Sequence, residues 1–128
     1  MKLHHVAAVC SSQDNADRFY EGILGLKKIK TFSLNKDLAE QIFDTARECQ
    51  IILYGNEDFA IEVFIVSEKA EKATLFEHLC LEVEDKEELL LRCKSKGLAV
   101  KRIPKGDSLL TFIGDYDGNL FEIKESVA

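Results

Sequence analysis

The stretches KLHHVAAV, residues 2–9, and FEHLCLEV, residues 76–83, decide how this chain is interpreted, because a histidine opens an apolar run in both. His5 and His78 hold the corresponding positions. Each is followed much later by a second apolar run that carries one glutamate: Glu62 in FAIEVFIV and Glu122 in NLFEIKE. The same His-to-Glu span therefore occurs twice in 128 residues.

The signals between each histidine and its glutamate also recur in the same order. An amphipathic segment follows each histidine run and ends at Gly25-Leu26 in the first span and at Gly97-Leu98 in the second. A basic strand opening comes next, with Lys27, Lys28 and Lys30 in one copy and Lys101 and Arg102 in the other. Self-similarity of this kind indicates a duplicated structural unit, here β-α-β-β-β twice.

Hydrophobic periodicity places the elements of each unit. In the first we expect strands at 3–9, 27–34, 49–54 and 59–66, and a helix at 14–24. In the second we expect strands at 77–83, 99–103, 108–113 and 120–124, and a helix at 86–96. Residues 35–48 fit either a short helix capped by Asn35 or a loop over a pocket. The polar stretch 67–74 connects the units.

Strand alternation predicts where the polar side chains point. Glu62 lies opposite Ile61 and Val63, and Glu122 lies opposite Phe121 and Ile123. The apolar faces are expected to pack against helices, so the glutamates and histidines emerge on the reverse face. His4 is expected to point away from His5 and to be structural or at a dimer contact.

Two imidazoles and two carboxylates are a suitable ligand set for one divalent metal ion. The alternatives are ordinary: His5 as a half-exposed strand histidine, Glu62 in a salt bridge with a lysine, and Glu122 paired with Lys124. Glu62 lies in an otherwise apolar strand, and an unpaired buried carboxylate is costly, so Glu62 requires a partner of some kind. Gln41, Phe43 and Arg47 are candidates for a segment that covers a substrate, with a surface helix as the alternative.

Composition bounds the remaining possibilities. The chain is 46% hydrophobic and 31% charged with a net charge of -6, which fits one globular domain of residues 1–128 and disfavours nucleic acid as a partner. No apolar run reaches the length of a membrane span. The four cysteines form no C-x-x-C pair and are expected to be reduced and mostly buried, in a cytoplasmic protein.

The opening LHHVAAVCSSQDNADRFYEGILGLKKIK and the closing GDYDGNLFEIKE resemble the vicinal oxygen chelate superfamily, which includes glyoxalase I, bleomycin-resistance proteins and extradiol dioxygenases. Tyr116 replaces the usual proline of the closing motif. The resemblance covers nearly the whole chain. It implies an α+β fold in which two βαβββ modules, about 1–66 and 75–126, form a curved mixed sheet around a metal cup.

The resemblance also implies a site. Its metal ligands would be His5, Glu62, His78 and Glu122, holding Ni, Co or Zn ahead of Fe or Mn. A carboxylate at Glu62 is typical of the glyoxalase I and epimerase branch, whose enzymes move a proton between carbons next to a carbonyl. Glu122 is then the candidate base and Glu62 a second, more fixed carboxylate.

Two positions depart from glyoxalase I. Val9 stands where that enzyme commonly has an arginine that binds the glutathione carboxylate, and Val66 stands where it commonly has an asparagine. A different small-molecule substrate is therefore expected. The resemblance further implies a homodimer. The alternatives within the same fold are a metalloepimerase and a metal-free protein that binds or sequesters a small molecule.

Overall fold

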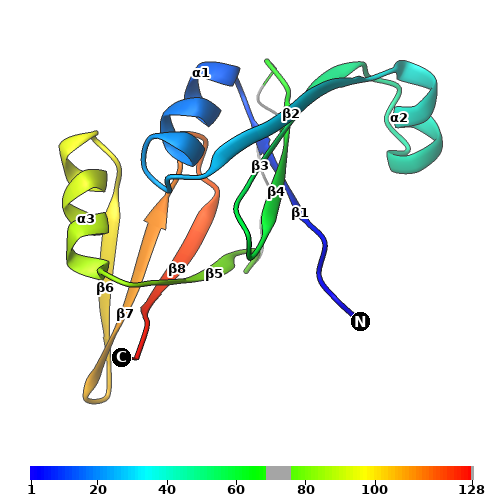
Figure 1. Ribbon diagram of the computed structural model, residues 1–128. Coiled ribbons are helices and arrows are strands. Elements are labelled where there is room, and N and C mark those ends of the chain that lie inside the picture. The colour runs from blue at the N-terminus through cyan, green and yellow to red at the C-terminus, as the bar shows by residue number, and fades with distance from the viewer. Residues whose placement is uncertain (69–75, 128) are drawn as a thin grey trace. The chain divides into compact units, whose positions relative to one another are not determined.

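The computed structural model describes residues 1–68 and 76–127, arranged in two compact units, Met1–Ala70 and Glu71–Ala128. Each unit holds its own four-stranded mixed sheet; α1, η1 and α2 belong to the first unit and α3 to the second (Figure 1). The predicted α+β class and the two βαβββ modules are confirmed. The predicted connector at 67–74 lies mostly outside the described residues.

The first unit has the sheet order β1-β4-β3-β2, with β1 parallel to β4 and the other neighbours antiparallel. The ambiguous segment after β2 is a helix, α2, and the side chain of Asn35 caps it by accepting a hydrogen bond from the backbone N–H of Leu38. In Figure 1, α2 lies beyond the end of β2, away from α1. The elements in order are β1 (Val6–Cys10), α1 (Gln13–Ala16), the π-helix η1 (Asp17–Glu21), β2 (Lys27–Leu34), α2 (Lys36–Phe43), β3 (Cys49–Gly55) and β4 (Ala60–Ile65).

The second unit repeats this topology without the inserted helix. Its sheet order is β5-β8-β7-β6, and β5 runs parallel to β8. The elements are β5 (Leu79–Val83), α3 (Lys86–Ser95), β6 (Val100–Lys105), β7 (Ser108–Gly114) and β8 (Leu120–Glu125). Gly25 and Gly97 follow the helical segments of the two units with φ of +72° and +77°, which is the left-handed conformation that glycine adopts most easily.

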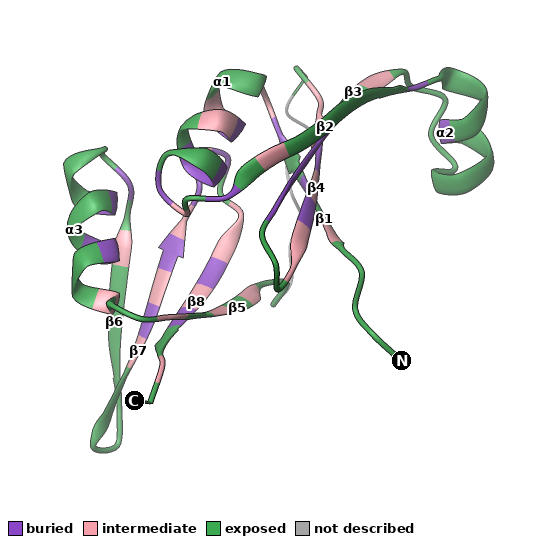
Figure 2. Ribbon diagram, in the orientation of Figure 1, coloured by how far each residue is buried: buried purple, intermediate pink, exposed green. Residues whose placement is uncertain are grey.

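Burial follows the predicted alternation, as the purple and pink segments along β7 and β8 in Figure 2 show. One face of each sheet is apolar and buried, and it carries Ile61 and Val63 in the first unit and Phe121 and Ile123 in the second. The helical residues Phe19, Tyr20, Leu90 and Cys93 are also buried. The tyrosine rings of Tyr20 and Tyr54 stack with centroids 5.3 Å apart, which ties η1 to β3.

The first helix differs from the prediction of one α-helix over 14–24. After Ala16 the hydrogen bonds lengthen to i→i−5, with the N–H of Gly22 donating to the carbonyl of Asp17 and that of Leu24 to Phe19. A Cβ atom at Gly22 would lie 2.4 Å from the carbonyl oxygen of Arg18, so this close approach requires glycine. Ala16, Phe19 and Tyr20 are nevertheless buried as the spacing predicted.

Two strands begin later than predicted. β1 starts at Val6 and β5 at Leu79, so His5 and His78 each lie one residue before a strand. The physical reason is the parallel ladder. Val6 pairs with Ile61 and Leu79 with Phe121, near the first residues of β4 and β8, and earlier residues have little partner strand left.

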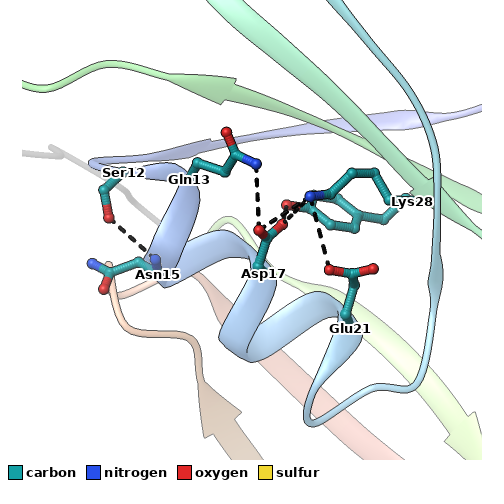
Figure 3. A network of polar contacts seen from close by, with 7 residues as sticks. Ser12, Gln13, Asn15, Asp17, Glu21 and Lys28 are labelled. Carbon is teal, nitrogen blue, oxygen red and sulfur yellow. Dashed lines mark hydrogen bonds and ion pairs between the residues drawn. The ribbon is translucent and has the colours of Figure 1, made fainter.

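A polar network on the helix-covered side of the first sheet holds the π-helix to β2 and β3 (Figure 3). The hydroxyl of Tyr54 donates to Oδ1 of Asp17 at 2.7 Å, and the Nζ of Lys28 lies 3.0 Å from the same atom. Lys28 also pairs with Glu21 at 3.9 Å. Within the basic opening of the edge strand β2, Lys28 is therefore half-buried and paired.

This network predicts a pH-dependent contribution to stability. Burial opposes ionisation of Asp17, but the hydrogen bonds from Tyr54 and Lys28 outweigh it and lower the pKa of Asp17 below its ordinary value. The carboxylate therefore stabilises the fold above the unfolded-state pKa of about 3.9, and this contribution is lost as the pH falls through the lower folded-state pKa. We expect Asp17→Asn to lower the free energy of unfolding by about 1–2 kcal/mol at pH 7.

Urea unfolding at several pH values measures this effect. The difference between wild type and Asp17→Asn should shrink towards zero in acid. Asp14→Asn is the matched control, because Asp14 lies in the same helical segment but its side chain is 80% exposed. Its ion pair with Arg18 is long, at 4.0 Å, and therefore weak. A difference that stays constant down to pH 2 would show that the Asp17 charge has no role in stability.

Candidate metal centre

The first unit brings His5 and Glu62 together. His5 immediately precedes β1, and Glu62 lies in the middle of the neighbouring parallel strand β4, opposite Ala7. The Nε2 of His5 is 3.7 Å from Oε1 of Glu62, and the two side chains are 38% and 19% exposed. Among the described residues, no lysine forms an ion pair with Glu62, so the salt-bridge alternative does not account for this carboxylate.

The second unit brings His78 and Glu122 together in the same way. The Nε2 of His78 is 3.8 Å from Oε1 of Glu122, and the side chains are 40% and 17% exposed. The Nδ1 of His78 lies 2.8 Å from the backbone carbonyl of Phe76. A carbonyl can only accept, so Nδ1 carries the hydrogen, and in the neutral ring it is Nε2, on the side of Glu122, that has the lone pair a metal ion needs.

Phe76 has a φ of +55°, a left-handed conformation that is rare for an aromatic residue. This conformation places its carbonyl within reach of the His78 ring. A strained backbone conformation, as at Phe76, is often found at functional sites. A carbonyl that orients a histidine ring is a common feature of metal sites.

The register of each sheet places its glutamate in a row of four residues across the strands. In the first sheet the row is Ala7, Glu62, Leu53 and Lys30. In the second it is Cys80, Glu122, Phe112 and Lys101. The duplication therefore extends to a lysine on the outer strand of each row. Both lysines lie in the basic strand openings that the sequence predicts, but the sequence does not by itself connect them with the glutamates.

A bulge in β2 explains why these lysines were not matched. Lys30 follows Gly25 by five residues, whereas Lys101 follows Gly97 by four. The pairing of β2 with β3 shifts between Lys28 and Lys30, which inserts one residue and turns Lys30 to the Glu62 face. An alignment of the two copies that allows one inserted residue in β2 matches Lys30 with Lys101.

The donor set of each unit suits a divalent transition metal. Ligand atoms that each lie about 2.0–2.1 Å from one ion can be up to roughly 4 Å apart, which includes both His–Glu separations. Within residues 1–68 and 76–127, no group of three or more His, Cys, Asp or Glu side chains is gathered as a metal site. Each unit thus offers two of the four expected ligands.

Cys80 lies beside Glu122 in the second sheet and is exposed overall. Partial burial of its thiol and the neighbouring charge of Glu122 raise the pKa of Cys80 above its ordinary value. The raised pKa favours the thiol form, which is a poor nucleophile. Cys10 and Cys93 are buried as predicted, and Cys49 is partly buried.

The closing motif positions Glu122 through a tight loop before β8. Oδ1 of Asp115 accepts hydrogen bonds from the N–H groups of Asp117 and Asn119 at 2.9 and 2.8 Å. Tyr116, in place of the usual proline, donates its hydroxyl to the carbonyl of Lys96 at 3.1 Å. The substitution adds a contact to the end of α3 and leaves Glu122 on β8.

Apolar side chains lie next to the His5–Glu62 pair. Val9 pairs in register with Phe64, which is on the same sheet face as Glu62, and Val9 is 43% exposed. The ring of Phe43, from the end of α2, meets Phe64 edge-on at 5.5 Å. Of the three residues suggested as a substrate cover, Phe43 thus lies beside the site face, whereas Arg47 is bound to Glu68 at 3.1 Å.

The family model of the Glyoxalase/Bleomycin resistance protein/Dioxygenase superfamily matches residues 2–123. The chain belongs to this superfamily, as the His-to-Glu duplication and the closing motif indicated. No curated protein matches the chain. No described helix is long and apolar enough to cross a membrane.

Solved structures support the fold. A glyoxalase family protein from Bacillus cereus is 19% identical with a TM-score of 0.77, over 100% of this chain and 95% of that one. The fosfomycin resistance protein FosX from Listeria monocytogenes is 14% identical with a TM-score of 0.73, over 99% and 94%. The trypanothione-dependent glyoxalase I from Leishmania major is 15% identical with a TM-score of 0.72, over 98% and 86%. At these identities the likeness concerns the fold.

Proposed function

We propose that this chain is a metal-dependent lyase or isomerase of the glyoxalase I type. His5, Glu62, His78 and Glu122 would together hold one divalent ion, Ni, Co or Zn. The observation that carries the proposal is the repetition of one arrangement, an imidazole Nε2 and a carboxylate Oε1 at 3.7 Å in the first unit and 3.8 Å in the second. Both pairs offer the imidazole and carboxylate atoms that a divalent transition metal ion binds.

The bound ion would supply Lewis acidity, polarising substrate oxygens next to a C–H bond. The residues supply the rest. The side chain of Glu122 is 17% exposed. Its carboxylate takes the proton from one substrate carbon and returns it to the next. Glu62 and the two histidines stay in place, and the carbonyl of Phe76 keeps His78 in one tautomer. An epimerase would use the same proton transfer.

The surroundings of Glu62 favour a substrate with an apolar group. Val9, Phe64 and Phe43 offer aromatic and aliphatic contacts beside the first pair. The row through Glu122 ends on Lys101, two strands away, at roughly 10 Å, where an anionic substrate group would find a cation. We propose an α-hydroxycarbonyl, acyl or thiol-adduct substrate.

A second candidate is a metal-free protein of the same fold that binds or sequesters a small molecule. The apolar contacts at Val9, Phe64 and Phe43 favour it, because they would serve an organic ligand without any metal. The two His–Glu pairs would then be unused, which ranks this function second.

Metal analysis of the purified protein separates the two. The lyase predicts one equivalent of Ni, Co or Zn per chain, and EDTA should lower the melting temperature by several degrees, since a ligand bound only to the folded state stabilises it. The metal-free protein predicts no bound metal, a melting temperature that EDTA leaves unchanged, and an increase with an organic ligand. The second result would remove the basis for the proposed enzyme.

We also propose a homodimer. Leu38 and Ile42 lie one turn apart on α2 and are 46% and 60% exposed, an apolar surface that a second copy would cover. A Leu38→Glu/Ile42→Glu variant is expected to be monomeric by light scattering at micromolar concentration, where wild type is a dimer. Lys36→Glu is the control, because it changes the charge of the same helix by the same amount. Monomeric wild type would contradict the proposal.

A further inference from the structure

The two histidines of the opening stretch contact each other. The Nδ1 of His4 lies 3.0 Å from the Nδ1 of His5, and the rings meet edge-on with centroids 5.2 Å apart. The expectation that His4 points away from His5 is wrong, because both residues precede β1 and strand alternation does not govern them. Two nitrogens at this distance share one hydrogen, so one ring donates and the other accepts.

The direction of this hydrogen bond decides which nitrogen of a neutral His5 ring has the lone pair that a metal ion needs. When the Nδ1 of His5 donates, its Nε2 carries a lone pair, and this is the atom 3.7 Å from Glu62. When the Nδ1 of His5 accepts, a neutral ring carries its hydrogen on Nε2 and that atom is no longer a ligand. His78 has no such choice, because its Nδ1 faces the carbonyl of Phe76 at 2.8 Å.

We propose that His4 is a positioning residue for the metal centre: it accepts the hydrogen bond from the Nδ1–H of His5 and so holds the Nε2 of His5 ready to coordinate. The inference rests on the proposed function, in which His5 is a ligand. His4 has in the first unit the role that the carbonyl of Phe76 has in the second. Partners of this kind typically change metal affinity 10–100-fold.

Two variants separate the hydrogen bond from the ring contact. His4→Phe keeps an aromatic ring against His5 but removes the acceptor. His4→Asn removes the ring but keeps an acceptor, the amide Oδ1, near the position of Nδ1. His4 is exposed, so neither change should prevent folding, and the melting temperatures of the metal-free proteins verify this.

Two measurements follow. The first is the affinity for Zn²⁺, determined by competition with a chromogenic chelator. The second is the tautomer of His5 in the metal-free protein, from long-range ¹H–¹⁵N spectra at about pH 8.5, where imidazoles are generally neutral. We expect His4→Phe to bind Zn²⁺ 10–100-fold more weakly, with the hydrogen of His5 moved to Nε2. His4→Asn should stay close to wild type in both measurements.

Equal Zn²⁺ affinity in wild type and His4→Phe would overturn the proposal, and so would an equal loss in both variants, which would implicate the ring contact. If wild type binds no Zn²⁺, the proposed function fails. The tautomer measurement then tests the hydrogen bond by itself: an Nδ1–H tautomer of His5 that is lost in His4→Phe shows that His4 orients the ring of His5, and an Nε2–H tautomer in wild type overturns the proposal.

Discussion

A His78→Ala variant is expected to bind Zn²⁺ or Ni²⁺ more than about 100-fold more weakly than wild type, since changing a partner of a ligand alone costs 10–100-fold. His78 is already oriented, with Nδ1 bound to the carbonyl of Phe76 and Nε2 3.8 Å from Glu122. Alanine removes the proposed ligand and leaves the carboxylate of Glu122 without its imidazole neighbour. Isothermal titration of the metal-free protein measures the loss.

Glu122→Gln extends this test to the proposed base, and is expected to weaken metal binding and to lower turnover by about 10²–10⁴-fold. Glu82→Gln is its matched control, because Glu82 is on the neighbouring strand β5 and the same face but is exposed and lies two register positions further along. Metal affinity that His78→Ala and Glu122→Gln leave unchanged would show that these residues are not ligands.

The second large effect concerns the substrate. Activity on the methylglyoxal–glutathione hemithioacetal is expected to be roughly 10²–10⁴-fold below that of an ordinary glyoxalase, because two hydrogen-bonded or charged contacts are replaced by valines. Val9 is 43% exposed on the Glu62 face, and Val66 follows β4 with only its backbone N–H donating, to the carbonyl of Cys10. Neither side chain can bind a carboxylate. The assay is the rate of S-lactoylglutathione formation at saturating metal.

Ordinary glyoxalase efficiency would contradict this prediction and would require another cation for the glutathione carboxylates. Arg47 is already paired with Glu68 at 3.1 Å, so Lys101, in the row through Glu122, is the stronger candidate. Lys101→Ala would then raise KM for the hemithioacetal. Lys105→Ala, on the same strand but outside the row, would leave KM unchanged.

Much of the secondary structure follows from local physics. β2 has the predicted bounds, β3 differs by one residue, and α3 begins at the predicted Lys86. Alternating or continuous apolar runs, and the left-handed glycines Gly25 and Gly97, are properties of neighbouring residues, so the sequence carries them directly. The same holds for the helix cap at Asn35, whose side chain reaches only three residues ahead.

The irregular elements could not be predicted in this way. The π-helix at Asp17–Glu21 and the bulge at Ile29 each shift the chain by one residue relative to regular structure. Both are stabilised by distant partners, since Tyr54 and Lys28 converge on Asp17 from two strands. Tertiary contacts of this kind override local preference, and the sequence shows no signal for them before the strands are paired.

By itself the sequence determined the superfamily, the duplicated modules and the four candidate ligands, because matched positions in two copies of a unit are visible without any contact. Only the tertiary structure decided that each histidine lies just before its strand, that each meets its own glutamate, and what orients it. A parallel ladder sets the relative height of two strands far apart in sequence, and a hydrogen bond depends on that height to within a few tenths of an ångström. The contacts of His5 with Glu62 and of His78 with Glu122 therefore belong to the fold alone.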